Sequence, residues 1–384
     1  MKIGIDARWI FPEITGIGSY TQELIRHLAA VDRNNEYILF FQNTLVRDRT
    51  VAYAHLEDAP RMEARIAPFG PFSLQNQLRM PGIIRDAELD LFHSTNFMLP
   101  FSACPRDRQG RTACVVTIHD LIPLIFPEHT PRALKSRFHF IYRAVMREVG
   151  RRADLIITVS ESSRRDILQH MTIPEERRNK VVAIHEGVSD RYTPGPPPSG
   201  ACPTILYVGR LDPYKNVPAL IRAFSRALKS GRIQARLKII GPRDARYPEV
   251  ERLISEKELH PHIDWPGYVD ADELRRAYRE ATVFVLPSLY EGFGLPVLEA
   301  MACGTPVICG NRASLEEVVG DAAVLFDPQN EDALAAALES VLTDPARAEA
   351  LRVKGLHRAA QFSWETTARK TIEAYEQCAV QSGE

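Results

Sequence analysis

The chain has 384 residues, of which 45% are hydrophobic, and its formal net charge at neutral pH is −1. This length and apolar content allow two domains with real cores, and the balanced charge argues against a protein drawn to nucleic acid by its overall field. No run of about 18 apolar residues occurs, which argues against a membrane-spanning helix. Residues 1–6 are predicted to form a short, charged strand rather than a signal peptide.

The six cysteines are scattered, and no two of them form a C-x-x-C pair or a metal-ligand spacing. We therefore expect free thiols in a reducing cytoplasm and no metal site. Cys303 and Cys309 flank a Gly-Thr-Pro turn and are expected to be buried as small, apolar side chains.

The first half of the chain alternates apolar and amphipathic segments, beginning with a strand over residues 2–7 and a helix over 19–31. The apolar segments are nearly continuous, which is typical of parallel strands buried on both faces. Ser160 is predicted to cap a helix over 161–170, because a serine oxygen accepts from free N–H groups of the first turn. The other predicted strands cover 36–41, 89–93, 113–118, 155–159 and 181–184.

A proline- and glycine-rich segment, residues 193–203, is the predicted boundary between two domains, because it favours neither helix nor sheet. Strands and helices alternate again after it. Two such halves predict two doubly wound α/β domains, with the ligand in a cleft at the C-terminal ends of the strands. In the second half we predict strands at 204–208, 236–240, 263–265, 282–286 and 307–309, and helices at 217–228, 249–257, 272–280, 297–303, 333–342 and 366–380.

The most informative segment is residues 288–300, in which Glu291 and Glu299 lie on either side of a turn that leads into a helix. Gly292 and Gly294 allow the backbone to approach a phosphate closely, and the free N–H groups of a helix N-terminus attract anions. A ligand with a diphosphate in the middle and hydroxyls at both ends, such as a nucleotide sugar, suits this layout. The alternative is a surface turn with two solvated carboxylates.

The pattern Glu-Gly-Phe-Gly-Leu-Pro-x-x-Glu in this segment resembles the Glu-x7-Glu motif of the retaining glycosyltransferases of family 4, which have the GT-B fold. The resemblance implies two Rossmann-like domains facing each other across a donor cleft, 1–192 on the acceptor side and 204–365 on the donor side. It implies that a tail helix, 366–384, packs back on the first domain. Glu291 would hold hydroxyls of the donor sugar, and Glu299 would bind the ribose. Backbone contacts to sugar and phosphates would come from Gly292, Phe293, Gly294 and Leu295.

A basic loop, residues 209–216, follows the first strand of the second half and contains Arg210 and Lys215. It resembles the Gly-Arg-(4)-Lys element of the same family. Transfer of a sugar leaves negative charge on a nucleoside diphosphate, which needs a metal or fixed cations. The chain has no Asp-x-Asp pair suited to Mg²⁺, so we expect these two cations to replace the metal, with no cofactor. The alternative is a solvated basic loop.

His119, followed by Asp120, ends a predicted strand of the first half. In the resembling family, a histidine here meets the hydroxymethyl end of the donor sugar and the leaving phosphate. Asp120 is the candidate to orient its ring. The alternative is a structural histidine at the end of a strand, because a lone histidine is a weak signal.

Two further donor contacts are implied by the resemblance. The segment containing Gly16 and Gly18 resembles the glycine loop that closes over the donor diphosphate, although a flexible turn is the alternative. Tyr268 and Val269 align with the edge whose backbone contacts the nucleobase.

Basic side chains recur at helical spacing from Arg132 to Arg151, with an apolar stripe beside them. One interpretation is that this helix makes a peripheral contact with the anionic inner face of the cell membrane. The other, which we favour from sequence, is an ordinary amphipathic helix whose apolar side is core.

These features predict a retaining, metal-independent glycosyltransferase that moves a hexose from a nucleotide diphosphate sugar to a glycan or lipid-linked acceptor in surface-polysaccharide synthesis. The segments at residues 6–8, 16–18 and 119–123 resemble the mannosyltransferase branch, which makes GDP-mannose the first choice of donor. A UDP-sugar donor, a nucleotide-sugar epimerase and a non-catalytic binding module remain alternatives.

Overall fold

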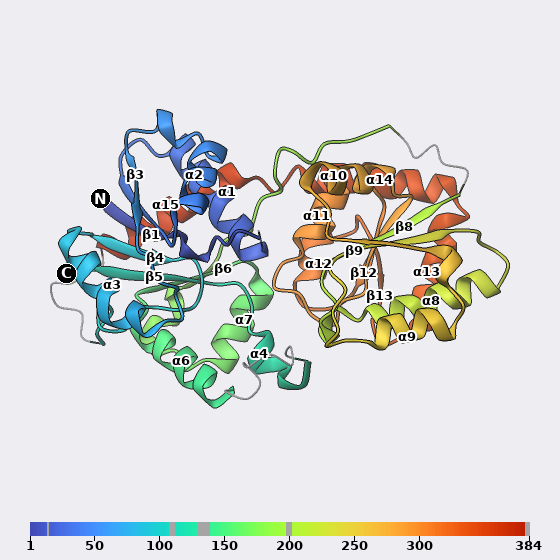
Figure 1. Ribbon diagram of the computed structural model, residues 1–384, viewed down its shortest axis with the longest axis horizontal. Helices are drawn as coiled ribbons and strands as arrows, with labels where there is room; N and C mark the ends of the chain where they lie inside the picture. The colour runs from blue at the N-terminus through green and yellow to red at the C-terminus, as the bar shows by residue number, and fades with distance from the viewer. Residues whose placement is uncertain (14, 107–111, 130–138, 197–201, 381–384) are drawn as a thin grey trace. The chain divides into compact units, whose positions relative to one another are not determined.

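The computed structural model in Figure 1 describes residues 1–13, 15–106, 112–129, 139–196 and 202–380. The chain divides into two compact units. The first comprises Met1–Leu121, His139–Gly187 and Ser363–Glu384, and the second comprises Ile122–Phe138 and Val188–Phe362. This division differs from the expected boundaries in that the short helix α4 (Ile122–Ile125) belongs to the second unit.

The first unit contains a parallel sheet of seven strands in the order β3-β2-β1-β4-β5-β6-β7. The chain builds the sheet outward from β1 in one direction and then returns to β1 to build it in the other, so the switch point lies between β1 and β4. The strands are β1 Lys2–Asp6, β2 Glu36–Phe41, β3 Met62–Ile66, β4 Leu91–Ser94, β5 Ala113–Ile118, β6 Leu155–Thr158 and β7 Val181–Ala183.

Helices cover both faces of this sheet (Figure 1). The C-terminal helix contacts α1 and β5, so both ends of the chain contribute to the first unit. The helices are α1 Gly16–Val31, α2 Thr44–Tyr53, α3 Leu74–Asp86, α6 His139–Arg152, α7 Glu161–His170 and α15 Trp364–Val380. Ser160 caps α7 as predicted, since its side chain accepts from the N–H of Ser163.

The second unit contains a parallel sheet of six strands in the order β10-β9-β8-β11-β12-β13, with its switch point between β8 and β11. The strands are β8 Thr204–Val208, β9 Arg236–Ile240, β10 Ile263–Gly267, β11 Val283–Leu286, β12 Val307–Gly310 and β13 Val324–Phe326.

Helices again cover both faces, with α8, α9 and α13 on one side and α10, α11 and α14 on the other (Figure 1). The helices are α8 Val217–Lys229, α9 Glu249–Glu256, α10 Ala271–Glu280, α11 Leu295–Ala302, α12 Ser314–Val319, α13 Glu331–Leu342 and α14 Pro345–Ala359. Two doubly wound parallel sheets confirm the predicted fold class. Of the α-helices and strands given above, the prediction lacked seven: α2, β3, α3, α4, α12, β13 and α14.

Candidate active site

The loops that follow β8 and β11 lie at the switch point of the second sheet. The two strands pair with each other, and β8 also pairs with β9 on its other side. Ligands of open parallel sheets bind at such a point, outside the C-terminal ends of the strands. Arg210 and Lys215 follow β8, and Glu291 follows β11. Three of the four predicted catalytic residues therefore belong to the loops at this one point.

Lys215 and Glu291 form an ion pair across these loops. The Lys215 Nζ lies 2.7 and 2.9 Å from the two carboxylate oxygens of Glu291, and the side chains are 15% and 10% exposed. The buried Ser288 hydroxyl donates to Glu291 Oε1 at 2.5 Å. A buried carboxylate is stable only when it is paired and hydrogen-bonded, and these two donors meet that need.

Two small polar side chains hold the backbone of the loops in place. The hydroxyl of Ser314, at the start of α12, lies 2.8 Å from the carbonyls of both Glu291 and Phe293. Asn216 donates from Nδ2 to the carbonyls of Pro287 and Pro328, and it has a left-handed backbone, φ 56°, where α8 begins. Sequence reasoning missed Ser314, and no sequence signal marked it, because its partners are backbone carbonyls about twenty residues away.

The turn after Glu291 leads directly into α11. Gly294 is the residue before the helix and has φ 115°, a left-handed conformation that L-amino acids rarely adopt. A Cβ at this position would lie 2.8 Å from Leu315 Cδ2. A proline occupies the first turn of the helix, as predicted, where its missing N–H costs nothing. The turn thus delivers backbone N–H groups at a helix N-terminus beside Glu291.

Arg210 extends from the same edge of the sheet. Its Nε donates to Asp212 Oδ2 at 2.6 Å, and the arginine side chain is 60% exposed whereas the Asp212 side chain is 1% exposed. The hydroxyl of Tyr207 donates to the Arg210 carbonyl at 2.6 Å. Burial, with a further contribution from Glu291, raises the pKa of Tyr207 far above its usual value, so this hydroxyl stays protonated. The exposed guanidinium is available to an anion while its loop is fixed.

Glu299 lies on α11 and accepts a hydrogen bond of 2.8 Å from the hydroxyl of Tyr278 on α10. The predicted base-binding residues follow β10, where Tyr268 is 74% exposed and Val269 is partly buried. The neighbouring Gly267 carbonyl accepts from the Gly241 N–H after β9. Tyr268 and Val269 follow β10, whereas Gly292, Phe293, Gly294 and Leu295 follow β11, and β9 and β8 lie between these two strands in the sheet. The binding roles of these residues stay predictions.

His119 belongs to the first unit and follows β5. Its Nε2 lies 3.1 Å from the Thr95 carbonyl, its Nδ1 lies 3.4 Å from Glu186 Oε1, and its ring meets the Tyr20 ring edge to face at 4.7 Å. The hypothesis that Asp120 orients the His119 ring is wrong, because the carboxylate that faces Nδ1 of this ring belongs to Glu186. Sequence reasoning missed Glu186, which lies 67 residues after His119 in the chain and belongs to none of the motifs described above.

Gly16 and Gly18 do not lie in a loop. Thr15 accepts from the Gly18 N–H, and this cap starts α1 at Gly16, three residues before the predicted start. Neither glycine has a positive φ. The expected closing loop is therefore the first turn of a sixteen-residue helix, whose free N–H groups offer a different means of attracting an anion.

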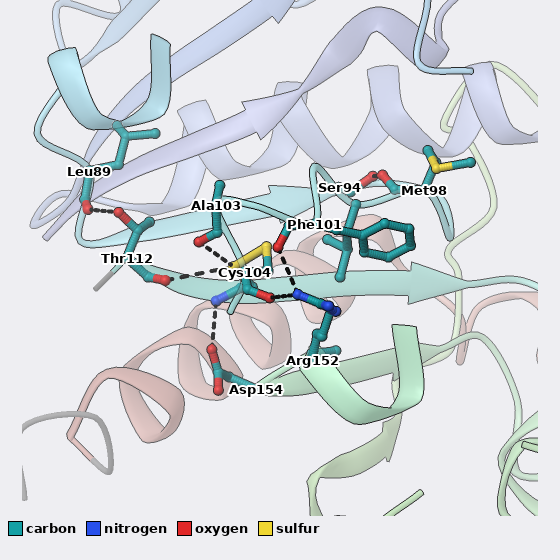
Figure 2. The surroundings of a disulfide bond; sticks show 12 residues. Leu89, Ser94, Met98, Phe101, Ala103, Cys104, Thr112, Arg152 and Asp154 are labelled. Carbon is teal, nitrogen blue, oxygen red and sulfur yellow. Dashed lines mark hydrogen bonds between the residues drawn. A yellow bond between two sulfur atoms is a disulfide. The ribbon is translucent and has the colours of Figure 1, made fainter. Parts of the chain in front are cut away.

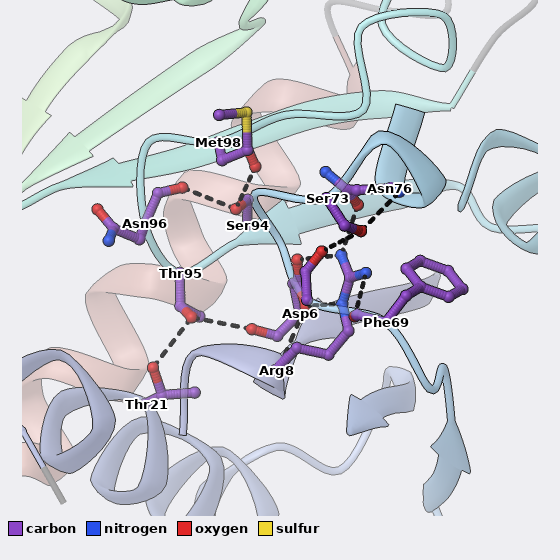
Figure 3. Close-up of polar contacts among 11 residues, drawn as sticks. Asp6, Arg8, Thr21, Phe69, Ser73, Asn76, Ser94, Thr95, Asn96 and Met98 are labelled. Carbon is purple, nitrogen blue, oxygen red and sulfur yellow. Dashed lines mark hydrogen bonds and ion pairs between the residues drawn. The ribbon is translucent and has the colours of Figure 1, made fainter. Parts of the chain in front are cut away.

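The Asp6-Ala7-Arg8 segment forms a buried network at the end of β1 (Figure 3). Arg8 and Asp6 are both fully buried, and Arg8 Nε and Nη2 each donate to Asp6 at 2.7 Å. Arg8 Nη2 also donates to Asn76 at 2.8 Å. The Asp6 carbonyl accepts from Thr95, so the network fixes the backbone that contacts His119. The Asp6-Ala7-Arg8 segment thus has a structural role within the first unit.

Cys104 and Cys114 form a disulfide next to β5 (Figure 2). The expectation that all six cysteines are free thiols is therefore wrong for this pair, because the loop after β4 brings Cys104 against the second residue of β5. Arg152 donates to the Cys104 carbonyl at 3.1 Å and fixes the same loop. Cys303 and Cys309 are free and buried, as predicted, and burial raises the pKa of the Cys303 thiol to about 12.

Only part of the basic helix lies within the described residues, because Arg132 and Lys135 fall outside them. In α6, Met146 and Val149 are buried, whereas Phe140 is 69% and Ile141 is 46% exposed. Arg143 and Arg147 are exposed as well. Glu148 pairs with Arg106, Arg151 and Arg152, and hydrogen bonds from Arg106 and Arg152 lower its pKa to about 2.

Two further findings concern membrane-spanning helices and metal-binding groups of side chains. Among the described residues, no helix combines the length and the apolar character needed to cross a bilayer. Within the same ranges, no three His, Cys, Asp or Glu side chains are grouped so that they could hold a metal ion.

Two doubly wound parallel sheets of this kind are the architecture of glycosyltransferases of the GT-B fold. The profile described as Glycosyl transferases group 1 matches residues 196–358, and the profile described as Glycosyltransferase Family 4 matches residues 14–192. The chain belongs to glycosyltransferase family 4.

Relatives extend over the whole chain. O-antigen chain mannosyltransferase B from Escherichia coli is 32% identical over 98% of this chain and 99% of its own length. The serotype-specific mannosyltransferase WbdA from Escherichia coli is 28% identical over 92% of this chain, which spans 44% of that protein. Sucrose-phosphate synthase from Thermosynechococcus elongatus has a similar fold, with a TM-score of 0.76, 22% identity and 98% coverage of both chains.

Proposed function

We propose that this protein is a retaining, metal-independent mannosyltransferase that transfers mannose from GDP-mannose to a glycan or lipid-linked acceptor in O-antigen or exopolysaccharide synthesis on the cytoplasmic side of the membrane. The observation that carries this proposal is the end-to-end similarity to O-antigen chain mannosyltransferase B. The grouping of Arg210, Lys215 and Glu291 at one switch point supports it, because this is where an anionic donor would be bound.

In this proposal the donor diphosphate lies at the N-terminus of α11, against the backbone of Gly292–Leu295. Lys215 and Arg210 stabilise the negative charge that develops on the leaving diphosphate, which fixed cations in a water-poor site do well. The donor displaces Lys215 from Glu291, and the freed carboxylate accepts hydroxyls of the mannose. Glu299 binds the ribose, and the backbone at Tyr268 and Val269 contacts the guanine.

Transfer with retention proceeds by front-face displacement in this proposal. The bond from the anomeric carbon to the diphosphate breaks while the acceptor oxygen attacks from the same face, and the leaving phosphate takes the acceptor proton. No side chain serves as a nucleophile. His119 assists from the first unit by adding positive charge near the leaving group, and no metal is needed, because this chain supplies its own cations.

The test is a binding panel followed by a turnover assay. Thermal unfolding is recorded with GDP-mannose, GDP, UDP-glucose, UDP-N-acetylglucosamine and UDP, each with EDTA, because a ligand of the native state raises the unfolding temperature. GDP-mannose is then incubated with octyl α-mannoside, and the anomeric configuration of the product is read by NMR. Stabilisation by guanosine nucleotides alone and an α-linked product support the proposal. Stabilisation by uridine nucleotides alone, or conversion of the donor without transfer, would overturn it.

We also propose that α6 contacts an anionic membrane. Its exposed Phe140 and Ile141, beside exposed Arg143 and Arg147, favour this interpretation over a helix whose whole apolar side is core. Sedimentation with vesicles of phosphatidylglycerol at low salt tests it. Binding that falls at high salt and in Phe140→Ser/Ile141→Ser supports the contact, and no binding at low salt would exclude it.

A further inference from the structure

Glu186 is a buried carboxylate that no sequence motif drew attention to. It lies three residues beyond β7, at the C-terminal edge of the first sheet, and only 5% of it is exposed. Among the described residues, its ion-pair partner is His119, whose Nδ1 lies 3.4 Å from Glu186 Oε1. Burying an ionised carboxylate without a partner is costly, so the ionised form of Glu186 depends on the contact with His119.

His119 faces a hydrogen-bond acceptor at both ring nitrogens. Its Nε2 lies 3.1 Å from the Thr95 carbonyl, which can only accept, so Nε2 carries a hydrogen. The Thr95 hydroxyl donates to the Asp6 carbonyl at 3.0 Å and accepts a hydrogen bond from the Thr21 hydroxyl (Figure 3). These two hydrogen bonds fix Thr95, whose carbonyl faces His119. Because Glu186 faces the other ring nitrogen, both acceptors face an N–H group only when Nδ1 carries a hydrogen too.

The other titratable groups around the ring do not provide this charge balance. Burial raises the pKa of Tyr20, which packs on the ring, so its hydroxyl stays neutral. Burial, with a contribution from His119, lowers the pKa of His93 to about 3, so that imidazole is neutral as well. Asp120 acts on Tyr142, whose pKa is raised by burial and by the Asp120 charge. Glu186 is thus the carboxylate that faces His119 Nδ1.

The segment that carries Glu186 is held on both sides by the C-terminal helix. The His185 carbonyl accepts from Thr367 at 2.7 Å. A Cβ at Gly187 would lie 2.1 Å from the Trp364 nitrogen, so the two backbones are in close contact and only glycine fits. The carboxylate is therefore pre-organised rather than carried on a free loop.

We propose that Glu186 is a positioning residue: it holds the His119 ring in one orientation with hydrogens on both nitrogens, and so keeps a positive charge at the C-terminal edge of the first sheet. The inference rests on the proposed function for the use of that charge, which is to assist departure of the donor diphosphate. Glu186 acts through His119 and has no contact with the donor of its own.

The test compares the full-length protein with Glu186→Gln, which keeps the shape of the side chain and removes its charge, and with Glu186→Asp. The first readout is the ¹⁵N NMR signature of the His119 ring at neutral pH, assigned with His119→Gln, which reports hydrogens on Nδ1 and Nε2 without any substrate. The second is kcat and KM for GDP-mannose with octyl α-mannoside. Thermal unfolding verifies that each variant is folded.

We expect both His119 nitrogens to carry hydrogen in the native protein and Nδ1 to lose it in Glu186→Gln, with Glu186→Asp intermediate. We expect kcat to fall about 10-fold in Glu186→Gln, with KM within about 2-fold, and no further loss when this change is added to His119→Gln. An unchanged ring signature in Glu186→Gln, or equal losses with and without His119, would overturn the inference. The expected ring signature without any mannosyl transfer would support the positioning role and refute the proposed function instead.

Discussion

Lys215 on the loop after β8 and Glu291 on the loop after β11 form a two-point contact, with Nζ 2.7 and 2.9 Å from the two carboxylate oxygens. The pair ties together the two loops at the switch point of the second sheet. Lys215 and Glu291 are expected to bind different parts of the donor. When no donor is bound, their charges neutralise each other. In the proposed mechanism, the donor replaces this contact with one to Lys215 and one to Glu291.

The first prediction separates stability from function at this pair. Lys215→Ala or Glu291→Ala leaves a nearly buried charge without its partner, so each should lower the free energy of unfolding by up to about 3 kcal/mol. Lys215→Met/Glu291→Gln removes both charges and should recover most of that loss. Activity should behave differently, with kcat about 10²–10³-fold lower in all three variants, because charge in the transition state is no longer stabilised. Urea unfolding and GDP release from GDP-mannose measure the two effects.

Lys354 serves as the control for this experiment, because it pairs with Asp321 at 2.7 Å on the exposed surface. Lys354→Ala should change the free energy of unfolding by less than about 1 kcal/mol and leave kcat unaltered. Full transfer activity in Glu291→Ala would contradict the assignment of the site.

The second prediction concerns the backbone at Gly294. An alanine there would hold a residue with a Cβ at φ 115° and would bring that Cβ to 2.8 Å from Leu315. Gly294→Ala should lower the free energy of unfolding by about 1–3 kcal/mol and weaken GDP binding, because the N-terminus of α11 shifts. Calorimetric titration with GDP measures the second effect.

Gly231 is a matched control for that change, since it has φ 70° and nothing within 4 Å of an added Cβ. Gly231→Ala should show a smaller loss of stability and unchanged GDP affinity. If the two variants bind GDP equally well, the geometry of the turn before α11 does not matter for the nucleotide.

The fold was predictable from sequence because parallel strands buried on both faces leave continuous apolar runs. β5 and β8 were predicted to the residue, and each consists largely of buried positions. β3 was missed because it is an edge strand with the sequence Met-Glu-Ala-Arg-Ile, in which no side chain is fully buried. Similarly, α2 has hardly any apolar face, and only Val46 and Thr50 of it are buried.

The candidate site was predictable where its residues lie close together in the sequence. Glu291 and the glycine turn before α11 could be read from one continuous segment. Glu186 could not, because its partner His119 is brought to it only by the order of β5, β6 and β7 in the sheet. The Cys104–Cys114 disulfide depends in the same way on the pairing of β4 with β5, which no cysteine spacing reveals.

The third prediction concerns that disulfide. It closes a loop with a sequence separation of 10, which corresponds to about 3 kcal/mol of stabilisation through restriction of the unfolded chain. Without reductant, Cys104→Ala/Cys114→Ala should be less stable than the native protein by about this amount. In the presence of reductant, which breaks the disulfide of the native protein, the two proteins should be equally stable. Cys202→Ala, at an exposed free cysteine, is the control. In denaturant without reductant, the native chain should titrate four thiols, Cys202, Cys303, Cys309 and Cys378, and a count of six would refute the bond.

The fourth prediction concerns acid and His93. Its ring is buried between the Tyr375 hydroxyl at 2.6 Å and the Thr117 hydroxyl at 2.8 Å, and burial lowers its pKa from 6.5 to about 3. The unfolded chain therefore binds a proton that the folded chain does not between these values. Stability linked to His93 is complete above about pH 6.5 and falls toward pH 3, by up to about 1.4 kcal/mol per pH unit.

His93→Gln keeps a polar group between the same hydroxyls but cannot titrate, so its stability should fall less steeply with acid than that of the native protein. The measurement is urea unfolding from pH 7.5 to 4.5 in a Trp265→Phe background. The chain has three tryptophans, and this change leaves only Trp9 and Trp364, both in the first unit, so the fluorescence follows the unit that contains His93. His260→Gln, on an exposed turn of the second unit, should keep the native slope. Equal slopes for His93→Gln and the native protein would mean that another group governs the acid sensitivity of this unit, because no proton would then be linked to His93 on unfolding.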